Sequence, residues 1–339
     1  MGHMLVTGGS GFIGGHLVEA LVRRGDRVRC LVRPTSRTDH LRGLDVEYVQ
    51  GELEDLEGLR RAVRGTEVVF HLAGLTAALR PRDLMRVNRE GVWHVARACA
   101  ACQTPPLLLL VSSVAAAGPA GRHRLRRESD APAPVSHYGR SKRAGELAAE
   151  QWAHVVPTTI VRPGIVFGPR NRETLPIFQS IYRSGIHFTP SFASPPLSLI
   201  HVSDLVEILL LAASSGPRLA PRNAAARASG QGYVFACVDE YPTYAKVGHM
   251  ISAALGRRHL FVVCAISPLP WIVGVAGDLV GVLRGRPDHL CTDKMRDATV
   301  HSWACSTETL RTALHFEPRR PLQERLKETA DWYLEQGWL

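Results

Sequence analysis

The stretch TGGSGFIG, residues 7–14, decides the fold of this 339-residue chain. It follows a short apolar run at residues 3–7 and precedes HLVEALVRRG, residues 16–25, whose apolar residues recur with helical periodicity up to Gly25. Glycines between a strand and a helix let the backbone approach a pyrophosphate, and the N-terminus of the helix favours its negative charge. The stretch therefore predicts a dinucleotide site.

Apolar strands and helical segments alternate over the first 170 residues. A long helix is expected at about 83–102 and another from residue 138. The run LLLLVSS, residues 107–113, is continuously apolar, as in a parallel strand that is buried on both faces. After residues 3–7, the expected strands are 27–33, 46–50, 67–73, 107–113 and 158–164. This alternation predicts an α/β fold, a Rossmann-type doubly wound parallel sheet.

The pattern changes after residue 170. We expect residues 1–170 to form the dinucleotide-binding domain and residues 199–242 to return to it through a helix at 202–214 and a further strand at 233–238. Residues 171–198 and 243–339 are expected to form a smaller, mostly helical C-terminal lobe that binds the substrate.

The composition narrows the class of protein. Hydrophobic residues make up 45% and charged residues 21%, as in a folded globular protein, and the net charge is +10. The arginines are scattered and no basic run is interleaved with aromatic residues, so we do not expect nucleic acid as a partner. A phosphorylated cofactor or an anionic membrane surface would account for the excess charge.

The seven cysteines, an odd number without framework spacing, indicate a reducing cytoplasm. Cys99 and Cys102 have no second pair nearby, so we expect a packed helix face and no metal site. No signal peptide precedes the first expected strand.

The end of the second expected strand bears on the choice of dinucleotide. An acidic residue there usually binds the ribose hydroxyls of NAD, whereas an Arg binds the 2′-phosphate of NADP. This chain has Val32 where the acid would stand, followed by Arg33, with Arg37 within reach. The sequence favours NADP(H) over NAD(H), although Arg33 could simply close the strand.

VSHYGRSKRAGELAAE, residues 135–150, opens a helix that places Tyr138 and Lys142 on the same face, four residues apart. The pair could be exposed and without function. Alternatively it is an acid–base pair, in which the ammonium lowers the pKa of the phenol toward neutrality.

Taken together, these segments resemble the extended short-chain dehydrogenases/reductases of the NAD(P)-dependent epimerase/dehydratase superfamily. The glycine loop resembles the family's first motif, and GELED (51–55), VFHLAG (69–74) and VNREGVWHV (87–95) resemble the next three. The serine strand, the Tyr-x-x-x-Lys helix and the nicotinamide segment of the family are similar to VSSVAAAG (111–118), YGRSK (138–142) and RPGIVFGP (162–169), and HVSDL (201–205) matches a helix-opening motif.

The resemblance implies roles for individual residues. Tyr138 would be the general acid/base, Lys142 would bind the nicotinamide ribose and lower the pKa of Tyr138, and Ser113 would hydrogen-bond the substrate oxygen. Asn88, His137 and His201 are expected to have local, non-catalytic roles. The expected cofactor contacts, besides Tyr138 and Lys142, are Gly8, Ser10, Gly11, Phe12, Ile13, Gly14, Arg33, Arg37, Glu52, Leu53, Leu72, Ala73, Gly74, Pro163, Gly164, Ile165 and Val166.

Within this family the chain is closest to the branch of 3β-hydroxysteroid dehydrogenases and dihydroflavonol reductases. Nucleotide-sugar members usually have Asn where this chain has Ile165, which cannot hydrogen-bond a sugar diphosphate. We therefore expect an oxidoreductase that interconverts a hydroxyl and a ketone on a hydrophobic, ring-bearing substrate. A nucleotide-sugar epimerase or dehydratase with bound NAD is the alternative, and a non-catalytic NADP sensor or a homodimeric assembly also stays open.

The segment 260–283 contains one charge, Asp278, and two prolines in an otherwise apolar run. Its length would suffice to span a bilayer, but the prolines and Asp278 disfavour a simple span. It could be a core strand followed by a helix of the lobe, a hydrophobic lid over the substrate, or a peripheral membrane contact.

Overall fold

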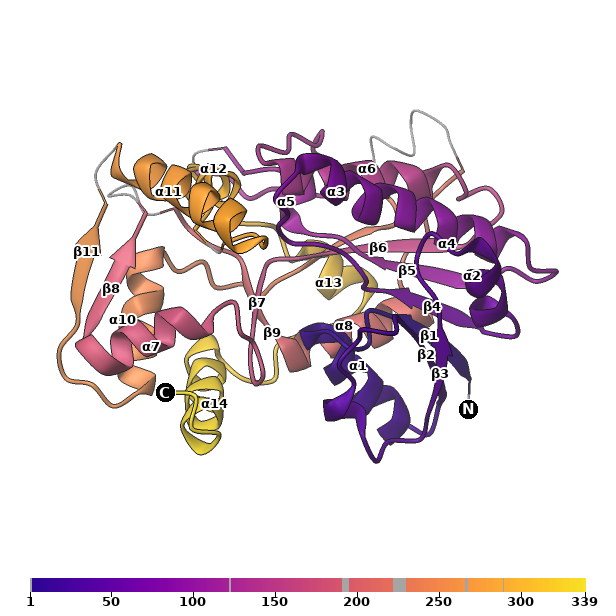
Figure 1. Cartoon of the computed structure of the whole chain (residues 1–339), viewed down its shortest axis with the longest axis horizontal. Coiled ribbons are helices and arrows are strands. Elements are labelled where there is room, and N and C mark those ends of the chain that lie inside the picture. Colours follow the sequence, from indigo (N-terminus) through magenta and orange to yellow (C-terminus); the bar gives the residue numbers. More distant parts are fainter. Residues whose placement is uncertain (1, 122, 191–194, 222–229, 266–267, 289) are drawn as a thin grey trace.

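The computed structural model describes residues 2–121, 123–190, 195–221, 230–265, 268–288 and 290–339. A parallel sheet runs through the larger part of the molecule, with β1 next to β4 at its centre (Figure 1). Its strands, in spatial order, are β3 (Val46–Gln50), β2 (Arg27–Val32), β1 (His3–Thr7), β4 (Val68–His71), β5 (Leu107–Val111), β6 (Thr158–Pro163) and β10 (Tyr233–Ala236). The predicted Rossmann-type doubly wound parallel sheet is confirmed.

Helices cover both faces of this sheet (Figure 1). One face carries α1 (Phe12–Arg23) and α8 (Val202–Ser215); the other carries α2 (Leu56–Val63), α4 (Gly91–Ala100) and α6 (His137–Glu150). Successive residues of a strand point to opposite faces, so Leu5 of β1 packs in the core under α2 and α4, whereas Val6 packs under α1 and α8. Short elements complete this part: α3 (Pro81–Met85), η1 (Asp39–Leu41), η2 (Arg86–Glu90) and α5 (Val114–Ala117).

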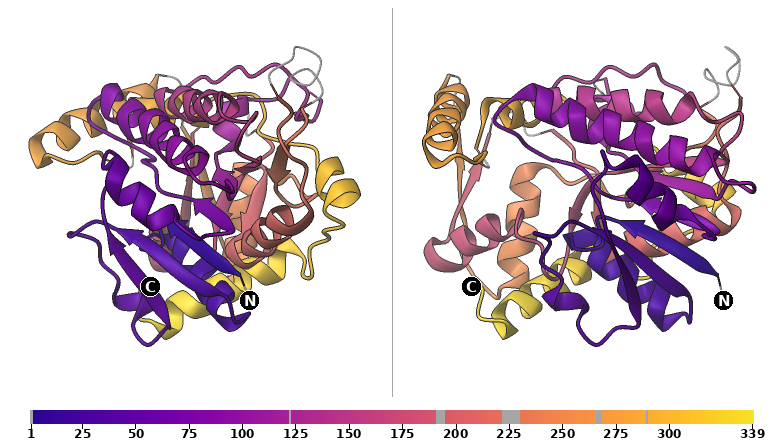
Figure 2. Two further views of the ribbon diagram at one scale, coloured as in Figure 1. Left: turned by 90° about the vertical axis from the view of Figure 1, so that its right-hand side faces the viewer. Right: turned by 45° about the vertical axis from the view of Figure 1, so that its right-hand side comes forward.

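Two short parallel ladders and several helices build the rest of the chain. β7 (Ile165–Phe167) pairs with β9 (Leu199–His201), and β8 (Ile186–Thr189) pairs with β11 (Phe261–Cys264). The β8–β11 pair lies at the end of the molecule away from the sheet (Figure 1), and Figure 2 gives two further views of this lobe. The helices are α7 (Leu175–Ser184), α10 (Tyr244–Ala254), α11 (Leu269–Arg284), α12 (Thr292–Ala298), α13 (Glu308–Ala313) and α14 (Leu322–Glu335).

A buried ion pair ties the last helix to the sheet domain. Asp204, in the first turn of α8, accepts hydrogen bonds from the guanidinium of Arg325 in α14, with 3.1 Å between Nε and Oδ2. Both side chains are buried, and Arg325 also binds Glu328 at 2.9 Å, so removing Arg325 would leave the carboxylate of Asp204 uncompensated.

The segment 260–283 contains a strand, β11, and then a helix, α11, which is the order that the interpretation as a core strand followed by a helix of the lobe expects. However, β11 is not a core strand, because Phe261 and Val263 are 72% and 44% exposed. Over the described residues, no helix combines the length and the apolar character that crossing a membrane requires.

Candidate active site

The glycine loop connects β1 to α1 at the carboxyl edge of the sheet. Gly8 has a positive φ of 78°, and a Cβ on Gly14 would lie 2.1 Å from the Gly8 carbonyl oxygen, so both positions require glycine. The first turn of α1 contains no acidic residue. Its free backbone N–H groups and positive dipole end fit a pyrophosphate, which is the arrangement that a dinucleotide cofactor needs.

The end of β2 lies beside this loop. Val32, the last residue of the strand, is buried, whereas Arg33 and Arg37 are exposed. Ser36 holds the turn between them, since its Oγ accepts from the Arg33 N–H at 3.0 Å. In the described part of the chain neither guanidinium has a carboxylate partner. The turn therefore presents two unneutralised cations where a 2′-phosphate would be placed.

The loop after β4 is fixed by Asn88. Its Oδ1 accepts from the Leu75 N–H at 2.8 Å, and its Nδ2 donates to the Leu75 carbonyl and to Ser141 Oγ, each at 2.9 Å. A Cβ on Gly74 would approach Asn88 Oδ1 to 2.9 Å and Lys142 Nζ to 3.6 Å. Asn88 thus ties the loop carrying Leu72, Ala73 and Gly74 to α6.

Ser113, Tyr138 and Lys142 meet where β5 ends and α6 begins. Ser113 lies close enough to Tyr138 for its hydroxyl to act as a hydrogen-bond donor that lowers the pKa of the phenol. Lys142 is buried and its Nζ donates to the Val111 carbonyl, the last residue of β5, at 2.8 Å. The triad expected from the sequence is therefore assembled at one point of the carboxyl edge.

The remaining expected cofactor contacts follow other strands along the same edge. Glu52 and Leu53 come after β3; Glu52 is exposed, and Leu53 packs so closely on Gly91 that a Cβ there would lie 2.7 Å from Leu53 Cδ1. Pro163 ends β6, and the Ile165 N–H donates to the Ser198 carbonyl at 2.8 Å. The Ile165 side chain is 36% exposed, as a residue that lines an open site would be.

The first turn of α6 is capped by the residue that precedes it and by a residue of the distant helix α12. Ser136 Oγ accepts from the Gly139 N–H at 2.9 Å. Asp293, from the distant α12, accepts from the His137 and Tyr138 N–H groups at 2.7 and 2.9 Å. The three N-terminal donors of the helix that carries Tyr138 are thereby satisfied, and the carboxylate sits at the positive end of its dipole.

The pKa of Tyr138 departs from the sequence-based expectation in sign. Burial raises it, the hydrogen bond from Ser113 opposes this, and Lys142 is not among the groups that shift it. The reason is geometric, since the ammonium is directed at the Val111 carbonyl. Burial also lowers the pKa of Lys142 to about 8, with Glu146 opposing. The lowering of the pKa of Tyr138 that the sequence analysis expects from Lys142 therefore stays a prediction.

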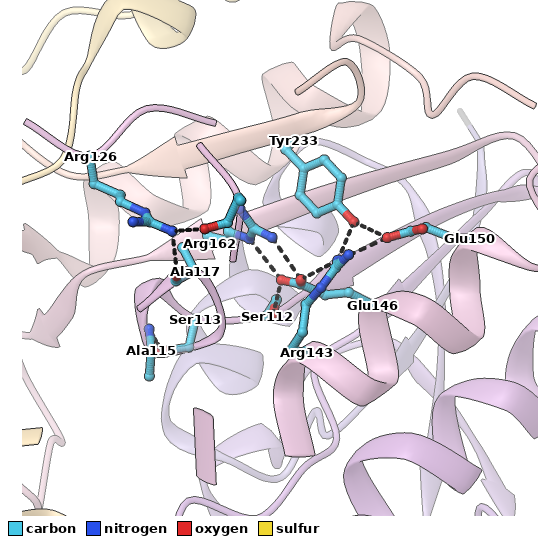
Figure 3. Close-up of polar contacts among 11 residues, drawn as sticks. Ser112, Ser113, Ala115, Ala117, Arg126, Arg143, Glu146, Glu150, Arg162 and Tyr233 are labelled. Atoms are coloured by element: carbon cyan, nitrogen blue, oxygen red, sulfur yellow. Dashed lines mark hydrogen bonds and ion pairs between the residues drawn. The ribbon is translucent and has the colours of Figure 1, made fainter. Parts of the chain in front are cut away.

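A buried charge network lies beside Ser112 and Ser113 (Figure 3). Arg162 binds Glu146 in a bidentate pair, with 2.8 Å between Nε and Oε1 and 2.7 Å between Nη2 and Oε2. Ser112, the neighbour of Ser113, donates to Glu146 Oε1 at 2.6 Å. Arg143 bonds Glu146, Glu150 and Tyr233, and completes the network. Glu146 stands one turn after Lys142 in α6, and its charge opposes the lowering of the pKa of Lys142.

Sequence reasoning missed the contribution of α12. Lys294 Nζ lies 5.5 Å from the centroid of the Tyr138 ring. Burial raises the pKa of Asp297 to about 6; the hydrogen bond with Ser136 lowers it and the charge of Asp293 raises it further. These residues of α12 lie close to Tyr138 and to the start of α6, and no local sequence motif predicts this. His201 is buried, packs on Phe167 and accepts from the Ser203 N–H at 3.3 Å, which is a local role, as expected.

Two cavities elsewhere in the molecule do not include Tyr138. One is lined by residues such as Glu128 and Tyr233, the other by residues of α14 such as Lys327 and Trp332. The substrate pocket itself is expected between residues 165–200 and 260–295, because these segments hold Ile165 and the apolar run 260–283. Neither cavity is this pocket, and part of both segments falls outside the described residues.

The model of the family described as "NAD dependent epimerase/dehydratase family" matches residues 4–223. This match covers the glycine loop, the Tyr138 helix and the sheet except its edge strand β10 and the first residue of β1.

Relatives with named activities share this region. A ceramide reductase of Caulobacter vibrioides is 38% identical over 203 residues, which cover 60% of this chain and 58% of that protein. A putative dihydroflavonol 4-reductase of Synechocystis is 33% identical over 62% of this chain and 63% of that protein. A 3β-hydroxysteroid-dehydrogenase/decarboxylase of Arabidopsis thaliana is 26% identical over 96% of this chain and 78% of its own. The chain thus spans about three fifths of the length of the first two relatives.

Solved structures match over nearly the whole chain. The crystal structure of gox2253 has a TM-score of 0.77 at 21% identity, covering 100% of both chains. The UDP-glucose 4-epimerase of Thermotoga maritima, solved with UDP-glucose, has a TM-score of 0.76 at 20% identity, covering 98% of this chain and 99% of its own. At such identities the likeness establishes the fold.

Proposed function

Because the chain belongs to the NAD-dependent epimerase/dehydratase family and is an enzyme of the extended short-chain dehydrogenase/reductase type, we propose that it interconverts a hydroxyl and a ketone on a hydrophobic, ring-bearing substrate with NADP(H). The observation that carries this proposal is the meeting of Ser113, Tyr138 and Lys142 beside a loop built for a pyrophosphate.

The residues of the site would have separate roles in cofactor binding and in proton transfer. The glycine loop would hold the pyrophosphate, and Lys142, which lies beside Gly74, would bind the nicotinamide end. When bound, the nicotinamide supplies hydride-transfer chemistry. Tyr138 Oη would give its proton to the substrate oxygen in reduction and take it back in oxidation, while Ser113 Oγ would steady the charge that develops on that oxygen. Ser113 is close enough to Tyr138 to affect the pKa of its phenol, so the two hydroxyls could act on one substrate oxygen.

The substrate class rests on apolar character near the triad. Ile165 offers no hydrogen bond to a sugar diphosphate, and a buried phosphate without partners is costly. The lobe that carries α12 also carries the apolar helix α11. The relatives named ceramide reductase and putative dihydroflavonol 4-reductase support the same class. Nucleotide-sugar chemistry with NAD is the alternative outcome of the test.

Ligand-dependent thermal stability tests the substrate class. With NADP⁺ present, a steroid-like or flavonoid-like ketone or alcohol should raise the melting temperature further, because a ligand at 100 times its Kd adds about 2.7 kcal/mol. UDP and dTDP sugars should give no shift. Ile165→Asn should weaken the apolar ligand without creating a response to sugar nucleotides. A shift with UDP-sugars and with no apolar ligand would establish the epimerase alternative.

The cofactor preference has its own test. We expect NADPH to bind more tightly than NADH by about 1.5–3 kcal/mol, the usual worth of hydrogen bonds to a charged group, because Arg33 and Arg37 are free to contact the 2′-phosphate. Arg33→Asp should abolish or invert the preference in a cofactor fluorescence titration. Arg23→Asp, an exposed arginine at the far end of α1, is the matched control. Equal affinities of the unaltered enzyme for the two cofactors would contradict the proposal.

We also propose a reducing, cytoplasmic location. All seven cysteines are free thiols in the structure, which supports a compartment that does not form disulfides.

A further inference from the structure

Helix α11 buries its small residues and exposes its large apolar side chains, which is the opposite of a usual surface helix. Its buried residues are small or cyclic and recur every three or four positions: Pro270, Gly274, Gly277 and Gly281. The large apolar side chains face outward and are 40–79% exposed: Leu269, Trp271, Ile272, Val275, Leu279, Val282 and Leu283. A surface helix normally turns such side chains toward the core. An apolar face this continuous on the outside marks an interaction surface.

The glycine face fixes the helix in this orientation. A Cβ on Gly277 would lie 1.8 Å from the Leu290 carbonyl oxygen, and one on Gly274 would lie 3.0 Å from Met295 Cγ. The backbone of α11 therefore rests directly on residues 290–295, an approach that only small residues allow. Rotating the helix would drive its large side chains into backbone, so the outer face stays outside.

The outer face also lacks negative charge. The sequence of α11 contains two charged residues, Asp278 and Arg284. Asp278 faces inward, where its Oδ2 accepts from Thr292 Oγ1 at 2.6 Å. The carboxylate of Asp278 therefore contacts α12 and does not contribute to the outer face. The exposed surface of α11 is apolar, with Arg284 at its C-terminal end.

Arginines border the C-terminal end of α11. Leu79 Cδ2 would lie 3.4 Å from a Cβ on Gly281, which places Leu79 beside this end. Exposed arginines follow Leu79 in the chain and stand at or just after the last residue of the helix: Arg80, Arg82, Arg284 and Arg286. Two aspartates accompany them, Asp83 and Asp288, the latter 3.7 Å from Arg284. The border is basic, as is the whole chain with its net charge of +10.

We propose that the outer face of α11 docks flat on a bilayer surface that contains anionic phospholipid. The apolar side chains would enter the boundary between headgroups and acyl chains, and the arginines would contact the anionic headgroups. At 16 residues α11 is suited to lie in this plane and not to cross the bilayer. A second copy of the chain is disfavoured as occupant, because each copy carries +10 and the two would repel.

A second apolar surface lies at the same end of the molecule (Figure 1). Phe188 of β8 and Val263 of β11 are cross-strand partners on one face, with Phe261 two residues away, and these side chains are 67%, 44% and 72% exposed. Figure 2 shows α11 protruding at the edge of the lobe, with α12 between it and the body of the molecule.

Docking at α11 would bring the active site to the bilayer. α11 rests on α12, whose Asp293 binds the first turn of the Tyr138 helix. An apolar substrate dissolved in the bilayer could then reach the triad without crossing water. This consequence rests on the proposed function, whereas the docking itself does not, so vesicle binding and turnover can fail independently.

Flotation of the full chain with lipid vesicles tests the proposal. The protein should float with vesicles of phosphatidylcholine and phosphatidylserine (7:3) and bind pure phosphatidylcholine more weakly. The triple change Ile272→Gln, Leu279→Gln and Leu283→Gln should lower the partition coefficient at least about tenfold, since it removes three large apolar side chains from the face that would enter the membrane. The matched control changes three exposed apolar residues of other faces: Leu147→Gln, Val155→Gln and Leu334→Gln.

A second variant tests the contribution of the arginines beside α11. Arg284→Gln with Arg286→Gln should reduce binding to the anionic vesicles and leave binding to pure phosphatidylcholine unchanged. Arg23→Gln with Arg27→Gln, exposed arginines away from α11, should bind like the unaltered protein. The proposal is overturned by absence of flotation, by equal binding of the triple variant, or by equal binding to both vesicle types. It is also overturned if the unaltered chain is a dimer that the triple variant splits, because a second copy would then cover α11.

Discussion

Replacing Tyr138 by Phe should lower kcat by about 10² or more on the substrate that the ligand screen identifies. The change removes Oη and leaves the ring, so the contact with Lys294 and the packing of α6 remain, while the hydrogen bond with Ser113 is lost. A general acid–base group typically contributes 10²–10⁴-fold to the rate. Steady-state kinetics with saturating cofactor measures the loss, and the melting temperature should stay close to that of the unaltered enzyme.

Tyr182→Phe is the matched control for this change. Tyr182 is 38% exposed in α7 and loses the same single oxygen, so its variant should turn over normally. Lys142→Met should impair both cofactor binding and turnover, because Lys142 lies beside Gly74 at the expected nicotinamide end. Near-normal rates for the Tyr138→Phe variant would mean that the proton reaches the substrate by another route.

Breaking the ion pair between Arg162 and Glu146 should be the most destabilising single change. Arg162 is 1% exposed and Glu146 is fully buried, and removal of one partner of a buried pair costs about 3–5 kcal/mol. Urea unfolding of Arg162→Met should show this loss. Burial alone would raise the pKa of Glu146, but Arg162 brings it below 4.5, so the pair is retained at neutral pH and is lost as the pH falls through that lowered pKa.

A double-mutant cycle isolates the pair. Arg162→Met combined with Glu146→Leu should recover part of the stability, because no uncompensated carboxylate remains. Arg60→Met, which removes an exposed ion pair with Glu57, should cost about 1 kcal/mol or less. If Arg162→Met cost no more than this surface control, the carboxylate of Glu146 would be better solvated than its burial indicates.

The sheet and the cofactor edge could be predicted because their signals are local. The strand at 107–111 is a single apolar run, and the glycine at 14 is required by a contact with the backbone of Gly8, six residues earlier. The spacing of Tyr138 and Lys142 likewise needs one turn of helix. In each case the pattern and the contact that it implies lie within one segment, so neither depends on the rest of the chain.

The parts that escaped prediction depend on distant contacts. Asp293 and Asp297 reach the triad from more than 150 residues away, without a motif. The sign of the pKa shift of Tyr138 depends on where the Lys142 ammonium points, which spacing does not specify. Arg162 did offer a signal, since an arginine inside a buried strand requires a charged partner, and Glu146 at one turn beyond Lys142 was available.

The carboxylate of Asp293 has a consequence for how the molecule opens. Because it closes the first turn of α6 from the other lobe, the amides of His137 and Tyr138 are protected only while α12 stays in place. The proton-transferring tyrosine and the helix beneath α11 therefore belong to one unit of local stability. Any displacement of α12, by thermal motion or by a surface bound to α11, would remove Asp293 from the His137 and Tyr138 amides. The first turn of α6 would then lose stability together with α12.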